Sequence, residues 1–130
     1  MVDRGLNRGT VAVALFDRAR QLEVGRADIG FERGIRLAGY DLDRRLAAPG
    51  ESVQLTLYWR AMAHVATDYS VFTHIRGAGN ALWAGHDGWP AEGAAPTASW
   101  AAGELIVDRH VLVLSPDTPA GAHTLEILAV

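Results

Sequence analysis

Strict alternation of apolar and polar side chains over residues 51–60 (ESVQLTLYWR) constrains the fold of this chain more than any other feature of its sequence. Successive side chains of a β-strand point to opposite faces of the sheet, so this pattern predicts a strand with one buried face. The buried face would carry Val53, Leu55, Leu57 and Trp59. A turn signal at Pro49-Gly50 precedes this strand, and residues 35–42 before the turn predict its antiparallel partner.

Four further segments also predict strands. Residues 69–75 and 81–86 are separated by a glycine-rich loop and predict a hairpin. Residues 104–114 and 122–129 would be the last two strands, because the prolines and the glycine between them exclude a continuous element. Short strands at regular spacing, joined by Gly and Pro turns, predict an all-β fold: an antiparallel β-sandwich of Ig-like type with about seven strands.

The whole chain, residues 1–130, is expected to form one domain, because a chain of this length suits a single hydrophobic core. Residues 1–30 are the least clear part and predict either an N-terminal strand or a linker. Residues 11–16 favour a strand, whereas residues 15–24 would equally suit a short helix. We expect the strand, since the helical stretch has no clear capping residue.

Charge and composition exclude several classes of function. With 15 acidic against 12 basic residues the net charge is −3, and the basic residues form no stripe that would bind nucleic acid. The chain has no cysteine, which excludes disulfides, thiolate metal sites and cysteine nucleophiles. The longest apolar run is residues 11–16, whereas a membrane-spanning helix needs about 20 residues. We therefore expect no membrane insertion by this chain itself.

A long loop predicted over residues 85–100 is the first place to look for a binding site. Aromatic rings can stack on the C–H faces of sugars while polar neighbours bind the hydroxyls. Glu92 is an acidic residue close in sequence to the tryptophans of this loop. The candidate ligand-binding residues are Trp83, His86, Asp87, Trp89 and Trp100. Trp89, between a glycine and a proline, is the best candidate for exposure, whereas Trp59 and Trp100 would equally suit core anchors.

No catalytic residue, metal site or cofactor is predicted. The histidines never occur as His-x-His, the spacing that puts two imidazoles on one strand face, although Asp108 and His110 do share a face. The G-x-S-x-G nucleophile motif and the phosphate-binding glycine motifs are absent. Glu104 and Asp108 would lie about 13 Å apart along a strand, too far for a glycosidase carboxylate pair.

An ordered series of Gly, Pro, Trp and polar positions resembles a β-sandwich module at the C-terminal end of bacterial multi-pass membrane proteins that look like glycosyltransferases using lipid-linked sugars. The resemblance covers residues 31–130. It rests on Arg36-Leu37, Gly39-Tyr40-Asp41-Leu42, Pro49-Gly50, Val71-Phe72-Thr73-His74, His86-Asp87-Gly88, Pro90, Pro96-Thr97, Trp100, Gly103-Glu104, Asp108-Arg109, Pro116-Asp117, Pro119 and Gly121.

The resemblance implies an Ig-like accessory module without catalytic residues that contacts glycan or another protein. The sequence departs from the family where Leu128-Ala129-Val130 replaces an ending similar to Gly-Leu-Tyr-Asp, and where no membrane-spanning region precedes the module. We expect an extracytoplasmic location if the chain was cut from a membrane-anchored parent, and a cytoplasmic one if it is the full natural chain.

Two main hypotheses for function arise from these features, and a hydrolase is a third, less favoured one. The first is a non-catalytic accessory or binding module that contacts glycan or cell-envelope material through residues 85–100. The alternative is a structural or protein-interaction domain that pairs through an edge strand as a homodimer. The C-terminal segment LEILAV suits that pairing, because it carries Glu126 as its one charge.

Overall fold

A computed structural model describes residues 7–15, 29–30, 34–44 and 46–129. Within these ranges the chain forms β-strands and short 3-10 turns, with no α-helix, and every strand pairing is antiparallel. The strands are β1 (Asn7–Leu15), β2 (Ile29–Gly30), β3 (Ile35–Leu42), β4 (Ser52–Ala61), β5 (Val71–Arg76), β6 (Leu82–Gly88), β7 (Leu105–Val113) and β8 (Gly121–Ala129). The predicted all-β class is confirmed.

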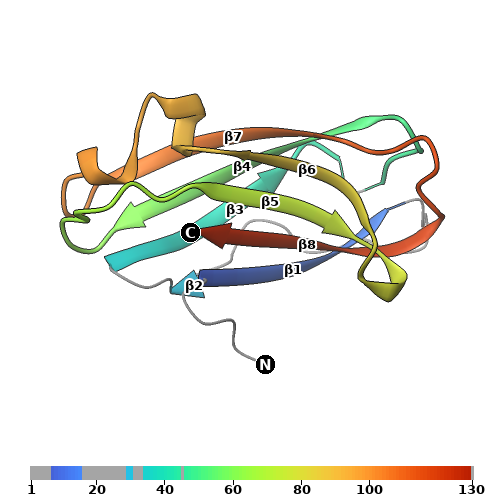
Figure 1. Cartoon of the computed structure of the whole chain (residues 1–130), viewed down its shortest axis with the longest axis horizontal. Helices are drawn as coiled ribbons and strands as arrows, with labels where there is room; N and C mark the ends of the chain where they lie inside the picture. The colour runs from blue at the N-terminus through green and yellow to red at the C-terminus, as the bar shows by residue number, and fades with distance from the viewer. Residues whose placement is uncertain (1–6, 16–28, 31–33, 45, 130) are drawn as a thin grey trace.

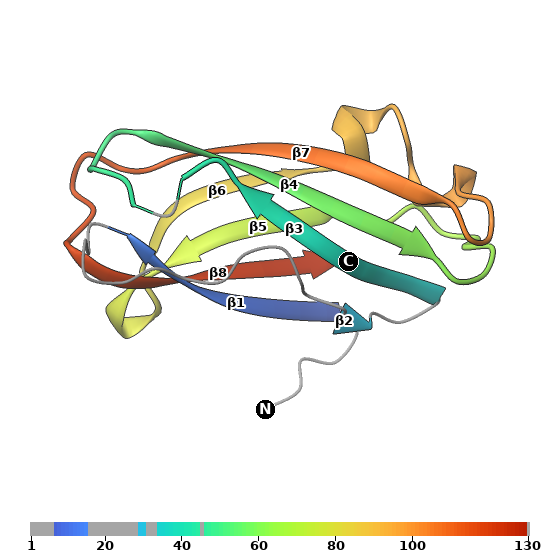
Figure 2. The same ribbon diagram turned by 180° about the vertical axis from the view of Figure 1, so that it is seen from behind.

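The strands form two sheets that face each other, with the order β1-β8-β5-β6 in one and β2-β3-β4-β7 in the other. Figures 1 and 2 show the two layers from opposite sides. The apolar face predicted for residues 51–60 points into the space between them: Leu55 and Leu57 are 0% exposed, and Trp59 is 1% exposed. The core therefore lies between the sheets, and the alternation along β4 places one face of that strand in the core.

The predicted local pairings are confirmed. β3 pairs with β4 around the register Tyr40↔Leu57, and β5 pairs with β6 as a hairpin. The predicted strand at residues 11–16 corresponds to β1 as far as residue 15, while most of the alternative helix at 15–24 lies outside the described residues. The predicted loop 85–100 starts too early, because β6 continues to Gly88 through the pairs His86↔Thr73 and Asp87↔Phe72.

The prediction that the C-terminal strand is an open edge is wrong. Leu125 of β8 pairs with Val11 of β1 on one side and with Ile75 of β5 on the other, so β8 is an inner strand. An inner strand has its backbone N–H and C=O groups engaged on both sides and cannot accept a partner strand. Alternation within one segment does not determine where that segment lies in the order of strands.

The turn between β3 and β4 is explained directly by its sequence. Pro49 and Gly50 occupy its centre, the Glu51 N–H donates to Ala48 O at 3.1 Å, and Gly50 has φ +84, which glycine adopts without strain. The Glu51 carboxylate also accepts the Ala48 N–H and lies 3.1 Å from Arg44. These two contacts hold the pKa of Glu51 below its ordinary value, the backbone hydrogen bond being the larger cause.

The end strand β7 separates buried from exposed side chains residue by residue. It pairs with β4 without a bulge from Leu105↔Arg60 to Val113↔Ser52. Its inward side chains are Ile106, Asp108, His110 and Leu112, and its outward apolar side chains are Leu105, Val107, Val111 and Val113. Two buried polar groups thus enter the core from one edge strand.

Replacing Leu112 by Ala should lower the free energy of unfolding by about 2–5 kcal/mol, because Leu112 is 0% exposed and its removal leaves a cavity. Leu105→Ala is the matched control on the same strand, where the side chain is 47% exposed, and should change stability by less than about 0.5 kcal/mol. Urea unfolding followed by tryptophan fluorescence measures both. Equal losses in the two variants would contradict the assignment of the two faces of β7.

Candidate functional site

One lateral margin of the sandwich is closed by polar side chains. The end strands β6 and β7 belong to different sheets and approach each other there. β6 contributes His86, and β7 contributes Asp108 and His110 through the i, i+2 spacing that puts both on its inward face. The two imidazole rings meet edge to face with their centroids 4.8 Å apart. The sheets are therefore joined at this margin by polar contacts.

The Asp108 carboxylate is fully buried, and three donors surround it. Oδ2 accepts a hydrogen bond from Trp59 Nε1 at 3.1 Å and lies 2.7 Å from His110 Nε2, while Oδ1 accepts the backbone N–H of Ala91 at 2.8 Å. A buried charge is costly unless it is hydrogen-bonded, and bonds to a carboxylate are stronger than bonds between neutral groups. Asp108 thus links β4, β7 and the loop after β6.

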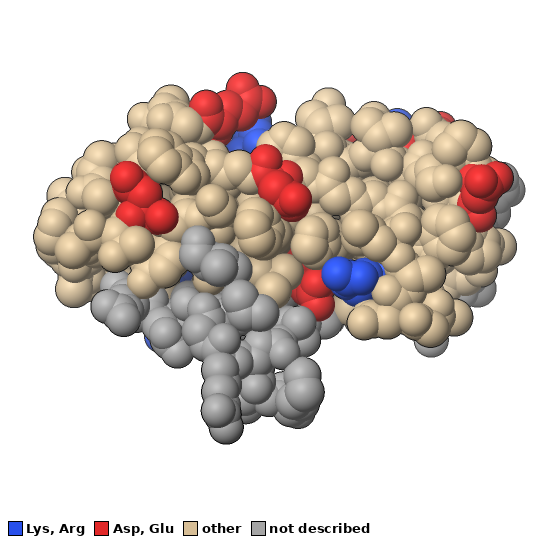
Figure 3. Space-filling view, in the orientation of Figure 1, with Lys and Arg blue, Asp and Glu red and all other residues tan. Residues whose placement is uncertain are grey.

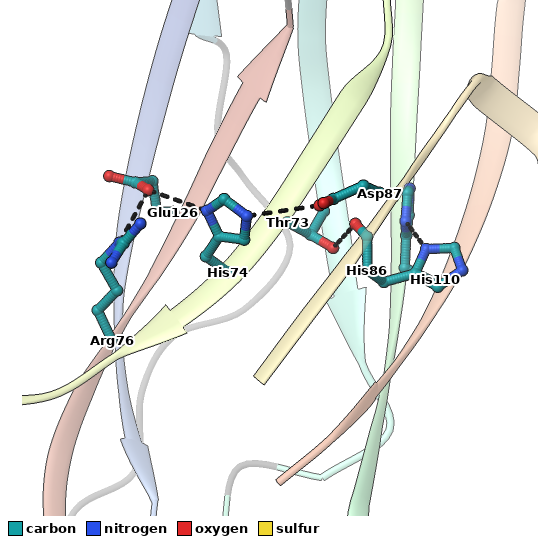
Figure 4. A network of polar contacts seen from close by, with 7 residues as sticks. All are labelled: Thr73, His74, Arg76, His86, Asp87, His110 and Glu126. Atoms are coloured by element: carbon teal, nitrogen blue, oxygen red, sulfur yellow. Dashed lines mark hydrogen bonds and ion pairs between the residues drawn. The ribbon is translucent and has the colours of Figure 1, made fainter. Parts of the chain in front are cut away.

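The contacts continue from Asp108 through two histidines toward the surface. His110 is 2% exposed, and its Nδ1 lies 2.7 Å from Nδ1 of the half-buried His86 (Figure 4). The His86 carbonyl accepts a hydrogen bond from Thr73 at 2.8 Å, which fixes the backbone at this point. Carboxylate, inner imidazole and outer imidazole therefore form a continuous line from the core to the margin.

The loop after β6 passes over this margin in an unusual conformation. Its 3-10 segment Pro90–Gly93 has Ala91 at φ 56, ψ 40 and Glu92 at φ 56, ψ 36, both in the left-handed region. A non-glycine residue there costs about 1–2 kcal/mol. The hydrogen bond from Ala91 N–H to the Asp108 carboxylate opposes that cost, and Pro90 is buried beside it. The buried carboxylate thus holds a strained loop in place.

Two surface hollows flank this loop and share Glu92. The larger has a volume of about 380 Å³ and is lined by His86, Asp87, Gly88, Trp89, Glu92 and Gly93. The smaller has a volume of about 230 Å³ and is lined by Ala91, Glu92, Val107 and Arg109. Trp89 is 47% exposed, so its ring remains available at the larger hollow. We call that larger space the Trp89 hollow.

Asp87 extends the polar contacts onto the outer face of the sheet. It points away from the core, opposite to its neighbour His86, and its Oδ1 lies 3.4 Å from His74 Nε2 (Figure 4). His74 Nδ1 lies 3.2 Å from a Glu126 oxygen that also accepts from Arg76 at 3.1 Å. Acidic groups are spread across this face in Figure 3, with few basic groups among them.

The structure gathers three of the five predicted ligand-binding residues at the Trp89 hollow: His86, Asp87 and Trp89. Trp100 lies elsewhere, 2% exposed, with its ring centroid 6.4 Å from that of Trp59 and its Nε1 donating to a carbonyl. It is a core anchor, which is the second of the two roles that its sequence allowed. Trp100 directly follows the 3-10 turn Thr97–Ser99.

Trp83 is the fifth candidate, and it does not line the hollow. It is half-buried on β6, and a Cβ on Gly77 would lie 2.9 Å from its Nε1, so the absence of a side chain at Gly77 makes room for the indole. Among the described residues its Nε1 is buried without a hydrogen-bond partner. Glu92, which lines the hollow, was signalled only by its closeness in sequence.

The described residues contain no group of three or more His, Cys, Asp or Glu side chains that could hold a metal ion. Nor do they contain a helix long and apolar enough to cross a membrane. No protein-family model, curated protein or solved structure gives a significant match to this chain. The function of the chain is therefore inferred from the residues of the site.

The strain in the loop predicts that replacing each of two alanines of the same segment by glycine changes the stability of the protein in opposite directions. Ala91→Gly should raise the free energy of unfolding by up to about 1 kcal/mol, because glycine adopts φ 56 without the penalty. Ala94→Gly is the matched control with φ −74 and should lower it by about 0.5–1 kcal/mol. Denaturant unfolding measures both, and a loss of stability in both variants would contradict the strained conformation.

Proposed function

We propose that this chain is a non-catalytic binding module and that the Trp89 hollow holds part of a glycan. The observation that carries the proposal is the exposed indole of Trp89 beside three polar side chains on one hollow: His86, Asp87 and Glu92. The C–H face of a pyranose stacks on an aromatic ring, while carboxylate and imidazole groups bind its hydroxyls. A hollow of about 380 Å³ suits one or two sugar rings.

The absence of a hydroxyl or thiol nucleophile from the residues that line the hollow supports binding rather than acyl-transfer catalysis. None of its six lining residues carries a hydroxyl or thiol, and the nearby Thr73 hydroxyl donates to the His86 carbonyl. The line of contacts from Asp108 to His86 therefore ends at the hollow without the Ser or Cys that a triad would activate. An Ig-like accessory role, as the resemblance to glycosyltransferase-associated modules implies, is part of this proposal.

Trp89→Ala should weaken binding of a neutral oligosaccharide by about fivefold or more, because truncation of an aromatic anchor residue costs over about 1 kcal/mol. Isothermal titration calorimetry with cello-, malto- and chito-tetraose measures the affinity without using tryptophan as the reporter. Leu82→Ala, an exposed β6 residue outside the hollow, is the control and should leave affinity unchanged. The ligand should be recovered intact by chromatography; no saturable heat with any glycan would overturn the proposal.

A second candidate function, contact with another copy of this chain, is favoured by the outward face of β7. That face presents four large apolar side chains that are 37–61% exposed: Leu105, Val107, Val111 and Val113. Exposed apolar side chains gathered on one strand of a sheet are typical of interaction surfaces. Arg109 lies at the middle of the row and is the one charged side chain among the five.

This candidate predicts a dimer that a charge on β7 would disrupt. In sedimentation equilibrium the wild-type chain should dimerise, and Val111→Glu should be monomeric because it buries a charge in the contact. Leu82→Glu places the same charge on an exposed site of β6 and should leave the dimer intact. A wild-type chain that stays monomeric at high micromolar concentration would remove the second candidate.

A further inference from the structure

We infer that the Trp89 hollow selects a cationic amino sugar, and that Asp108 and His110 are positioning residues that make His86 a hydrogen-bond acceptor toward it. This inference rests on the proposed function, since it specifies the ligand class of the same hollow. It is drawn from the order of donors and acceptors between the buried carboxylate and the hollow.

The contacts of Asp108 determine which nitrogen of His110 carries hydrogen. A carboxylate is an acceptor only, and Asp108 accepts from Trp59 and Ala91 as well as facing His110. His110 Nε2, at 2.7 Å from the carboxylate, must therefore carry its hydrogen. In a neutral imidazole one nitrogen is a donor and the other an acceptor, so Nδ1 of His110 is bare.

The bare nitrogen of His110 in turn determines which nitrogen of His86 carries hydrogen. Its Nδ1 lies 2.7 Å from the bare Nδ1 of His110, a separation that requires one hydrogen between the two nitrogens. That hydrogen belongs to His86, which leaves Nε2 of the neutral His86 ring without one. Nε2 has no partner among the described residues and is not a buried atom, and the ring lines the hollow. His86 therefore offers the ligand a lone pair.

Two carboxylates lie beside His86 at the hollow. Asp87 and Glu92 are both exposed carboxylates, which accept hydrogen bonds and attract positive charge, and no arginine lines the Trp89 hollow. The side chains of His86, Asp87 and Glu92 are therefore acceptors, and the indole N–H of Trp89 is the one side-chain donor among the residues that line the hollow. An alkylammonium group supplies three donors and a positive charge, and the Trp89 face adds a cation–π contact. The carboxylates of Asp87 and Glu92 would repel an acidic sugar, for which the Trp89 indole N–H is the one side-chain donor among the lining residues.

The first experiment reads the protons directly. In ¹⁵N-labelled protein at pH 8, imidazole nitrogen shifts should report hydrogen on Nδ1 of His86 and on Nε2 of His110. Neutral histidine in water favours hydrogen on Nε2, so the result expected for His86 is the reverse of the default. Hydrogen on Nε2 of His86 at pH 8 would overturn the inference without affecting the proposed function.

The second experiment compares three ligands that differ only at C6: methyl 6-amino-6-deoxyglucoside, methyl glucoside and methyl glucuronide. NMR shift titration at pH 8 should give an affinity for the amino sugar about tenfold above that for the glucoside, with the glucuronide weakest. Equal affinities at pH 8 with binding still lost in Trp89→Ala would overturn the inference alone. No saturable shift with any of the three would overturn the proposed function as well.

His110→Phe tests the positioning role, because it keeps an aromatic ring but removes the nitrogen that constrains His86. Hydrogen should then appear on Nε2 of His86, and the preference for the amino sugar should fall to about threefold or less while glucoside affinity is kept. His64→Phe, an exposed histidine outside the hollow, is the matched control and should change neither readout. An unchanged preference in a folded His110→Phe protein would overturn the role of His110. If that variant does not fold, the wild-type shifts and the three ligands still decide the inference.

Discussion

The buried carboxylate of Asp108 is the interaction on which the candidate site depends. It receives hydrogen bonds from a core tryptophan, from the backbone of the loop after β6 and from a buried histidine. Such a group is tolerated in the core because all three contacts are present together. The core anchor Trp59 is thereby connected to the surface residue His86 in three steps, and the loop that forms the Trp89 hollow is attached to the same oxygen pair.

Much of the fold could be predicted from local patterns, whereas the order of the strands could not. Alternation over residues 51–60 identifies the buried face of β4 because successive side chains of a strand point to opposite faces of the sheet. The side-chain pattern of the segment LEILAV does not indicate which strands pair with it, and β8, to which the segment contributes, is an inner strand. Its outward Glu126 is 8% exposed and is accommodated by Arg76 and His74 from β5, contacts that are 50 and 52 residues away in sequence.

The candidate site was predictable to the extent that its residues are close in sequence. His86, Asp87 and Trp89 could be identified because they lie within four positions at a strand end. Asp108 and His110 share a strand face, but their importance depends on β7 lying opposite β6 in the other sheet. Trp100 is the opposite case, because its aromatic ring and its place at the end of the predicted loop suited a sugar-binding site. Its ring instead packs against Trp59, and its Nε1 donates a hydrogen bond to the Ala95 carbonyl, so the side chain lies in the core.

The convergence of these contacts also bears on how this margin of the molecule opens. Separation of β6 from β7 breaks the contact between the two imidazoles, and release of the strained loop breaks the contact of Ala91 with the same carboxylate. Loss of either contact leaves Asp108 with fewer donors in a dry environment, so one opening makes the other less costly. The loop and the sheet margin therefore form one cooperative unit, whose backbone amides exchange with solvent through a shared opening rather than independently.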